Sequence, residues 1–211
     1  MRSVIRLTLS LTVAGILLSY PVCAEIIGGV DFPAGAISFA DAVTNYSPVI
    51  QSGRPTAGNR NGDNSLGVPN SSFVSLGDGG VITLAFTDNF LTGSGSDDLD
   101  LWIFEIGTDV EDTFVEISKD NSVYVSVGKV FGSTSGIDID AFGFGPEDLF
   151  TYVRLRDDPD EGAQSGATVG ADFDAVGAIS TVAAIPEPST YVLFLAGLAG
   201  IWTAKRNGLL R

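Results

Sequence analysis

An acidic loop that leads into a strand-like stretch is the part of the sequence best suited to chemistry. Asp97, Asp98 and Asp100 follow a Gly-Ser-Gly-Ser run, and Glu105 closes the apolar stretch that begins at Leu99. Calcium takes roughly six to eight oxygen ligands with some freedom of placement, and this segment offers carboxylate and carbonyl oxygens together. The spacing also fits one unit of a Gly-x-Gly-x-Asp-x-Leu calcium repeat, but a solenoid needs about three units or more.

A second group of carboxylates stands later in the chain. Asp172 and Asp174 flank Phe173, so in a strand both carboxylates point to one face while Phe173 points to the core. If this strand lies beside the stretch 99–104, Asp100 converges with the pair. We therefore predict a weak structural calcium site, with a Kd of about 10⁻⁴ to 10⁻³ M as in extracellular modules. The alternative is a solvated acidic face, where charge runs usually lie. The six candidate ligands are Asp97, Asp98, Asp100, Glu105, Asp172 and Asp174.

Two further features have plainer interpretations. An acidic run at 157–161 surrounds Pro159, and we interpret it as a solvated loop without a metal. Trp102 and Phe104 alternate with apolar neighbours, so one set of rings could serve as a platform for carbohydrate. Aromatic residues in strands more often fill the core, which is the alternative.

The sequence lacks the side chains of most hydrolytic and metal chemistry. It has no histidine, and its single cysteine, Cys23, lies in a segment that we expect to be cleaved. Ser-His-Asp catalysis, Cys-His catalysis and the usual zinc sites need imidazole or thiolate, so these classes are excluded. Hydrolysis by two carboxyl groups about 5 to 10 Å apart in a cleft remains open. We predict a non-enzymatic protein, with a carboxylate glycosidase as an alternative.

The elements that must position these residues are short strands. Alternating apolar stretches are separated by clusters of Gly, Asp, Asn and Pro, and 78–80 and 119–121 supply turn chemistry. We predict an all-β fold with one β-sandwich domain at 25–182. A short helix could start at 40–43, and 58–72 is predicted to be a loop. The expected strands are 81–86, 99–104, 113–117, 123–127, 152–155 and 173–182.

The N-terminus has the pattern of a signal peptide. Arg2 and Arg6 precede an apolar run at 7–18, and small residues before Ala24 stand where signal peptidase reads. We expect residues 1–24 to be removed by cleavage after Ala24. The alternative is a lipoprotein with a lipidated Cys23, but the preceding Tyr-Pro-Val places a bulky residue and a proline where small residues are needed.

The C-terminus has the pattern of a membrane segment. A linker at 183–190 contains two prolines that break incoming structure, and the apolar segment 191–204 is followed by a basic tail at 205–211. From 189 to 204 a helix would be roughly 24 Å long, shorter than the ~30 Å hydrocarbon core, so it spans only where the bilayer thins. The alternative is an apolar helix packed on the body.

The tail at 185–211 resembles the PEP-CTERM sorting signal. It contains the triplet Pro186-Glu187-Pro188, an adjacent Ser-Thr, a short Leu/Gly/Ala-rich segment and terminal Lys and Arg, in that order. The resemblance implies recognition by an exosortase, a membrane cysteine protease of Gram-negative bacteria, with cleavage near the triplet. The protein would be exported, anchored through its C-terminal transmembrane helix before processing, and then released or transferred to the envelope. The positive-inside rule agrees with this orientation.

The body resembles bacterial cell-surface proteins with a galactose-binding-like jelly roll, over about residues 41–179. One departure is Asn121, where the family usually has Asp-Gly, but Asn tolerates the left-handed turn conformation. The resemblance implies a jelly-roll-like sandwich in the extracellular matrix or exopolysaccharide layer. It implies no galactose binding, because such sandwiches host many functions. The motifs that carry it are Leu66–Asn70, Phe73–Gly80, Asp100–Glu105, Val115–Ser118 and Gly170–Val176.

The net charge of the body limits the classes of partner that it can bind. All of the 26 acidic residues except Glu187 fall within 25–185, against 6 of the 11 basic residues, so this segment has a net charge of −19. Such a surface repels nucleic acid and anionic lipid and attracts divalent cations. We expect signal peptidase and exosortase as processing partners, the membrane as a partner of the C-terminal helix, and extracellular polysaccharide as a partner of the body. A calcium-dependent carbohydrate-binding module is the second hypothesis for the function.

Overall fold

The computed structural model describes residues 23–107, 111–161, 165–179 and 181–183. These residues belong to one compact unit, Val22–Ile185. The signal peptide before Cys23, the Pro-Glu-Pro linker after Ala183, the C-terminal helix and the basic tail lie outside the described residues. Within the described ranges, no helix is long and apolar enough to cross a membrane.

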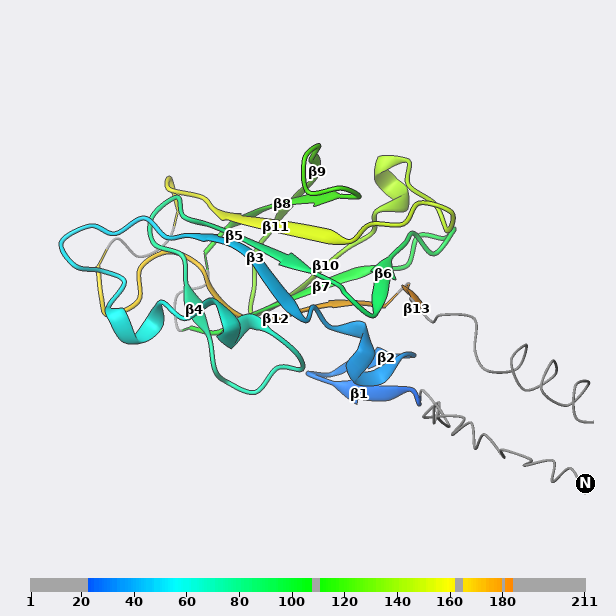
Figure 1. Cartoon of the computed structure of the whole chain (residues 1–211), viewed down its shortest axis with the longest axis horizontal. Helices are drawn as coiled ribbons and strands as arrows, with labels where there is room; N and C mark the ends of the chain where they lie inside the picture. Colours follow the sequence, from blue (N-terminus) through cyan, green and yellow to red (C-terminus); the bar gives the residue numbers. More distant parts are fainter. Residues whose placement is uncertain (1–22, 108–110, 162–164, 180, 184–211) are drawn as a thin grey trace, which may run out of the picture. The chain divides into compact units, whose positions relative to one another are not determined.

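Two antiparallel sheets face each other as the layers of a sandwich (Figure 1). The five-stranded sheet has the order β3-β5-β11-β8-β9, and its strands are β3 Ala42–Ser47, β5 Val81–Ala85, β11 Tyr152–Asp157, β8 Thr113–Ser118 and β9 Val125–Val130. The four-stranded sheet has the order β10-β7-β12-β4, and its strands are β10 Thr134–Ile137, β7 Leu101–Glu105, β12 Asp172–Ala178 and β4 Val74–Ser75. The predicted all-β fold is confirmed, whereas its jelly-roll type stays a prediction.

Short elements complete the described part of the chain. Two further two-stranded sheets pair β1 Glu25–Ile27 with β2 Val30–Phe32, and β6 Asn89–Leu91 with β13 Thr181–Ala183. Short 3₁₀ helices lie at η1 Gly35–Ser38, η2 Ala57–Asn59, η3 Gly62–Ser65 and η4 Asp140–Phe142.

The main core lies between the two sheets and follows the two-residue period of the strands. On β11, Val153 and Leu155 are fully buried, whereas Arg156 beside them is exposed. Leu155 is paired with Ile82 of β5 and with Val115 of β8, so three neighbouring strands place apolar side chains in one row. This alternation is the reason that the strands were detectable in the sequence.

The β1–β2 hairpin covers the outer side of the four-stranded sheet with an aromatic cluster. The ring centroid of Phe32 lies 4.6 Å from that of Phe39 and 6.2 Å from that of Phe104. Gly177 on β12 permits this approach, because a Cβ there would lie 2.8 Å from the Phe32 ring and 2.9 Å from the Phe39 ring. Phe104 is only 4% exposed and Trp102 packs against the same cluster, so the two residues do not form an open carbohydrate platform.

Several sequence predictions about elements need correction. Residues 40–43 start no helix: Ala42–Ser47 form β3, an edge strand with an irregular register that makes its alternation hard to detect. The predicted strand at 173–182 is divided into β12 and β13, which pair with different strands. Asn121 has a φ of 60°, as expected for a left-handed turn residue.

Candidate functional site

A cluster of three aspartates lies at one end of the sandwich. Asp100 stands directly before β7, and Asp138 and Asp140 follow β10. One carboxylate oxygen from each residue lies within 4.8 Å of the other two. Asp100 is fully buried, and the other two are half-buried. Asp100 was a predicted ligand, whereas Asp138 and Asp140 were not identified from the sequence.

Strand pairing explains why these residues meet. β10 runs antiparallel to β7 with Ile137 opposite Leu101, so the residue after β10 lies beside the residue before β7. The Ile139 N–H donates to Asp100 Oδ2 at 2.9 Å, and the Asp140 N–H donates to Asp138 Oδ1 at 2.9 Å. The second bond forms an Asx turn that leads into η4.

The predicted glycine- and serine-rich loop joins this cluster. The Gly95 N–H donates to both carboxylate oxygens of Asp140, at 3.1 and 3.2 Å, and the Ser94 hydroxyl donates to Asp140 Oδ2 at 3.3 Å. The Ser96 hydroxyl donates to Asp98 Oδ2 at 2.8 Å. A pocket of about 220 Å³ opens here, and it is lined by Gly95, Ser96, Asp97, Asp138, Asp140 and Ala141.

The acidic groups around this pocket have no basic partner in the described part of the chain. Asp97, Asp98, Asp138 and Asp140 form no ion pair there, although every basic residue of the body is described. Several carboxylates that share one pocket repel each other, and a hard divalent cation with oxygen ligands would offset that repulsion. The arrangement is therefore suited to calcium, with hydroxyl and carbonyl oxygens of the loop available as further ligands.

Glu105 and Asp172 lie at the other end of the sandwich. β7 separates Asp100 from Glu105 by about 16 Å at ~3.3 Å per residue. Glu105 Oε1 accepts the N–H groups of Glu111 and Asp172 at 3.2 and 3.4 Å. Burial raises the pKa of Glu105 to about 9 and the pKa of Asp172 to about 7. Both side chains are only 6% exposed, so they are out of reach of a polymer substrate.

Asp174 has a role in holding a loop. Its carboxylate accepts the Asn70 N–H at 3.0 and 3.1 Å and the Ser71 N–H at 3.0 Å. The six predicted ligands therefore do not form one site. β12 does lie beside β7 as expected, but the two strands are antiparallel, so Asp172 and Asp174 lie away from Asp100.

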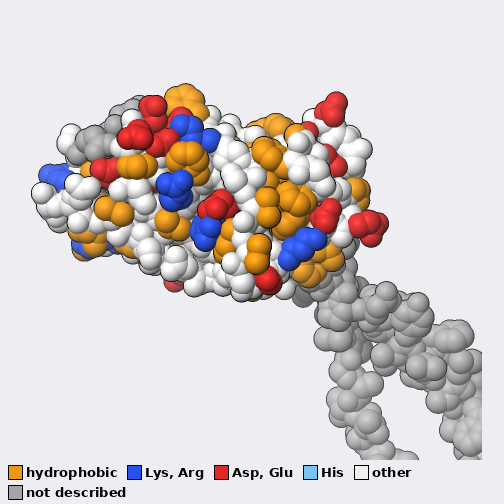
Figure 2. Space-filling view, turned by 90° about the horizontal axis from the view of Figure 1, so that it is seen from above, with side chains coloured by type: hydrophobic (Ala, Val, Ile, Leu, Met, Phe, Trp, Pro, Cys, Tyr) orange, Lys and Arg blue, Asp and Glu red, His pale blue; other side chains and the backbone are white. Residues whose placement is uncertain are grey.

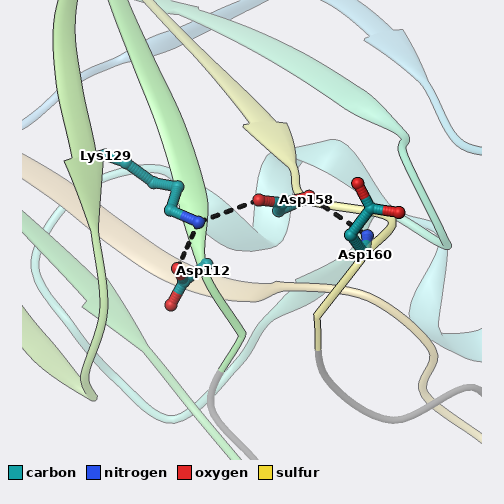
Figure 3. Close-up of polar contacts among 4 residues, drawn as sticks. All are labelled: Asp112, Lys129, Asp158 and Asp160. Carbon is teal, nitrogen blue, oxygen red and sulfur yellow. Dashed lines mark hydrogen bonds and ion pairs between the residues drawn. The ribbon is translucent and has the colours of Figure 1, made fainter.

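The acidic run at 157–161 is less solvated than predicted. Asp157 and Asp158 are buried, and only its later part is exposed. Lys129 lies between Asp112 and Asp158, 2.9 Å from Asp158 Oδ2 (Figure 3). The Asp160 N–H also donates to Asp158 Oδ1 at 3.1 Å. The hydrogen bond from Lys129 holds the pKa of Asp158 below its usual range.

The outer face of the five-stranded sheet mixes charges of both signs. The Arg154 guanidinium lies 3.8 Å from the Tyr124 ring centroid and bonds Glu116 at 2.7 Å, and Arg156 lies 4.3 Å from the Phe114 ring centroid. Figure 2 shows basic, acidic and hydrophobic side chains interleaved on this face. The face therefore lacks the single-sign charge of a surface for polyanions.

The sequence matches no protein-family model, and no curated protein matches it. The resemblances of the tail and of the body therefore stay predictions from the sequence.

Proposed function

We propose that the chain is an exported, non-enzymatic cell-surface or extracellular-matrix protein whose β-sandwich is stabilised by calcium. The observation that carries the calcium assignment is the meeting of Asp100, Asp138 and Asp140, together with a Gly-Ser loop that contributes hydroxyl and backbone groups. The ion would stabilise the turn after β10 against the strand start at β7. The role in the polysaccharide layer comes from the resemblance of the body to surface proteins.

Export and sorting rest on the two ends of the sequence. Cleavage after Ala24 would leave Glu25 as the new N-terminus, and Glu25 is the first residue of β1. A folded domain that begins at the expected cleavage point supports the signal-peptide prediction. Pro186-Glu187-Pro188 would then direct exosortase to the linker between this domain and the predicted membrane helix.

Calcium is expected to raise the melting temperature of residues 22–185, which form a compact unit by themselves. With a Kd of about 10⁻⁴ M, 10 mM calcium adds roughly 2.7 kcal/mol to the free energy of unfolding. That corresponds to about 5 to 10 °C for a domain of this size. The measurement is thermal unfolding in calcium and in excess chelator.

Three variants make the calcium test specific. Asp138→Asn should abolish the calcium-dependent shift, because it removes a charged ligand without changing the size of the side chain. Asp172→Asn and Asp160→Asn should keep the shift, because these residues lie elsewhere or face solvent. Equal melting temperatures with calcium and chelator would contradict the site, as would an unchanged shift in Asp138→Asn.

Replacement of Pro186 and Pro188 by alanine is expected to block processing of the tail. The exported precursor should then accumulate in the membrane fraction at its unprocessed mass, whereas the parent chain shortens. Mass spectrometry of both fractions from an exosortase-containing host measures this. Replacing Pro159, in an exposed loop of the body, is the control and should leave processing unchanged. Normal shortening of the double variant would contradict the sorting assignment.

A further inference from the structure

The loops that follow β3 and β11 meet at the end of the sandwich opposite η4 (Figure 1). Residues of these loops line a polar pocket. Its volume is about 270 Å³. It is lined by Gln51, Ser52, Arg54, Asp78, Ser165 and Val169. Every lining residue except Val169 has a polar side chain, which is unusual for a pocket that would take an apolar ligand.

One wall of the pocket is a tight turn with a fixed backbone. The Gln51 N–H donates to the Arg54 carbonyl and the Arg54 N–H donates to the Gln51 carbonyl, both at 2.9 Å. Between them, Ser52 and Gly53 have φ values of 51° and 78°. Positive φ values at both central positions are what a two-residue turn of this kind requires, so this wall has a defined backbone.

The buried carboxylate of Asp157 connects the loop before β5 to the loop after β11 by hydrogen bonds. Asp157, which is 1% exposed, accepts the Gly79 N–H and the Ala171 N–H, both at 2.7 Å. The Thr56 N–H donates to the Ala167 carbonyl at 3.0 Å and joins the segment after the turn to the loop that follows β11. These bonds hold the described residues of the pocket walls together before any ligand binds, which lowers the entropy cost of binding.

The polar groups of the pocket are arranged as donors and acceptors side by side. Gln51 Nε2 donates to Asp78 Oδ2 at 3.2 Å, and an Arg54 guanidinium nitrogen donates to the Gly166 carbonyl. These bonds orient the side chains and leave further amide, guanidinium and carboxylate positions available. The charges of Arg54 and Asp78 offset each other, so the pocket is neutral within a segment of net charge −19.

We propose that this pocket binds one sugar ring of a neutral polysaccharide. Sugar hydroxyls both donate and accept hydrogen bonds, which matches the alternation of amide, guanidinium and carboxylate groups. The volume equals that of about nine water molecules at ~30 Å³ each, the space of a single ring with its hydroxyls. A polyanionic glycan would be repelled by the acidic body. The proposal rests on the extracellular role proposed above and names its ligand class.

Affinity electrophoresis of residues 22–185 tests the proposal directly. The gels contain dextran, galactan or glucomannan as neutral polysaccharides, or alginate as a polyuronate. At least one neutral polysaccharide should retard the protein, and Arg54→Ala and Asp78→Asn should each weaken binding about tenfold or more, as expected for loss of a charged hydrogen-bond partner. Arg156→Ala removes an exposed arginine of the outer sheet face and should leave retardation unchanged. Melting temperatures of all variants verify that they are folded.

The outcomes separate this proposal from the proposed function. Absence of retardation by all three neutral polysaccharides overturns the pocket assignment, as does undiminished retardation of both pocket variants. Retardation by alginate alone overturns the neutral class. Retardation of the folded parent protein should be the same in calcium and in excess chelator, because the three-aspartate cluster lies at the other end of the sandwich. Loss of retardation in chelator would overturn the pocket and favour a calcium-dependent carbohydrate module, whereas export is measured independently.

Discussion

The free energy of unfolding of the β-sandwich is expected to fall by several kcal/mol as the pH rises from 5 to 9. Burial raises the pKa of Glu105 to about 9 and that of Asp172 to about 7, from ordinary values of 4.5 and 3.8. For each of the two groups, at any pH between its ordinary pKa and its raised pKa, the folded state holds a proton that the unfolded chain has released. Each pH unit over which one such proton is held costs about 1.4 kcal/mol of stability. The decline should be steepest between pH 5 and 7, where both groups contribute.

The other carboxyl groups with shifted pKa values do not reverse the loss of stability between pH 5 and 9. The raised pKa values of Asp157 and Asp88, both due mainly to burial, act in the same direction. The lowered pKa values of Asp158 and Asp148, due mainly to hydrogen bonds from lysine, stabilise the fold above their ordinary pKa. That stabilisation is lost only as the pH falls below about 4. The net slope between pH 5 and 9 is therefore negative.

Glu105→Gln tests whether the raised pKa of Glu105 causes this pH dependence of stability. The amide keeps the size of the protonated acid and an oxygen to accept the Glu111 and Asp172 N–H groups. It should match the parent protein near pH 5 and be more stable at pH 9, with a flatter dependence on pH. Urea unfolding at pH 5, 7 and 9 in chelator measures this. Glu147→Gln, at an exposed glutamate, should leave the slope unchanged. A parent protein that gains stability from pH 5 to 9 would contradict the prediction.

The longer strands with clear alternation were predictable from the sequence, and the shortest strands were not. β11 and β8 bury every second side chain between two sheets, so their period is visible in the sequence. β1, β2 and β10 have only three or four residues each, too few to establish a period. β10 is placed by its pairing with the distant strand β7, whereas β1 and β2 pair with each other in a hairpin that is held by the packing of Phe32.

The candidate metal site was predictable only in part, because register decides which carboxylates meet. The pattern Asp-x-Asp occurs around Phe173 and also around Ile139, where it carries Asp138 and Asp140. Choosing between them requires knowing which end of β7 each pair reaches. Pairing of β10 with β7 brings the second pair to Asp100, and the antiparallel pairing of β12 places the first pair toward Glu105.

Phe32→Ala is expected to lower the free energy of unfolding by about 3 to 5 kcal/mol, the usual cost of truncating a buried aromatic ring. Phe32 is fully buried against Phe39 and Phe104, in a cluster that attaches the β1–β2 hairpin to the four-stranded sheet. The hairpin starts at Glu25, so this cluster would fix the N-terminus that the predicted cleavage after Ala24 would create. Urea unfolding of residues 22–185 measures the loss.

The same hairpin supplies the matched control for that measurement. Ile26 is 75% exposed, so Ile26→Ala should change the free energy of unfolding by no more than about 0.5 kcal/mol. Limited proteolysis reports on the hairpin itself. The hairpin should be cut near Gly28 and Gly29 in Phe32→Ala, where it is released, and should stay protected in Ile26→Ala. Equal stability and equal protection of the two variants would show that the hairpin is not docked through its aromatic ring. A large loss confined to Phe32→Ala means that the β-sandwich domain depends on residues 25–32 for its stability.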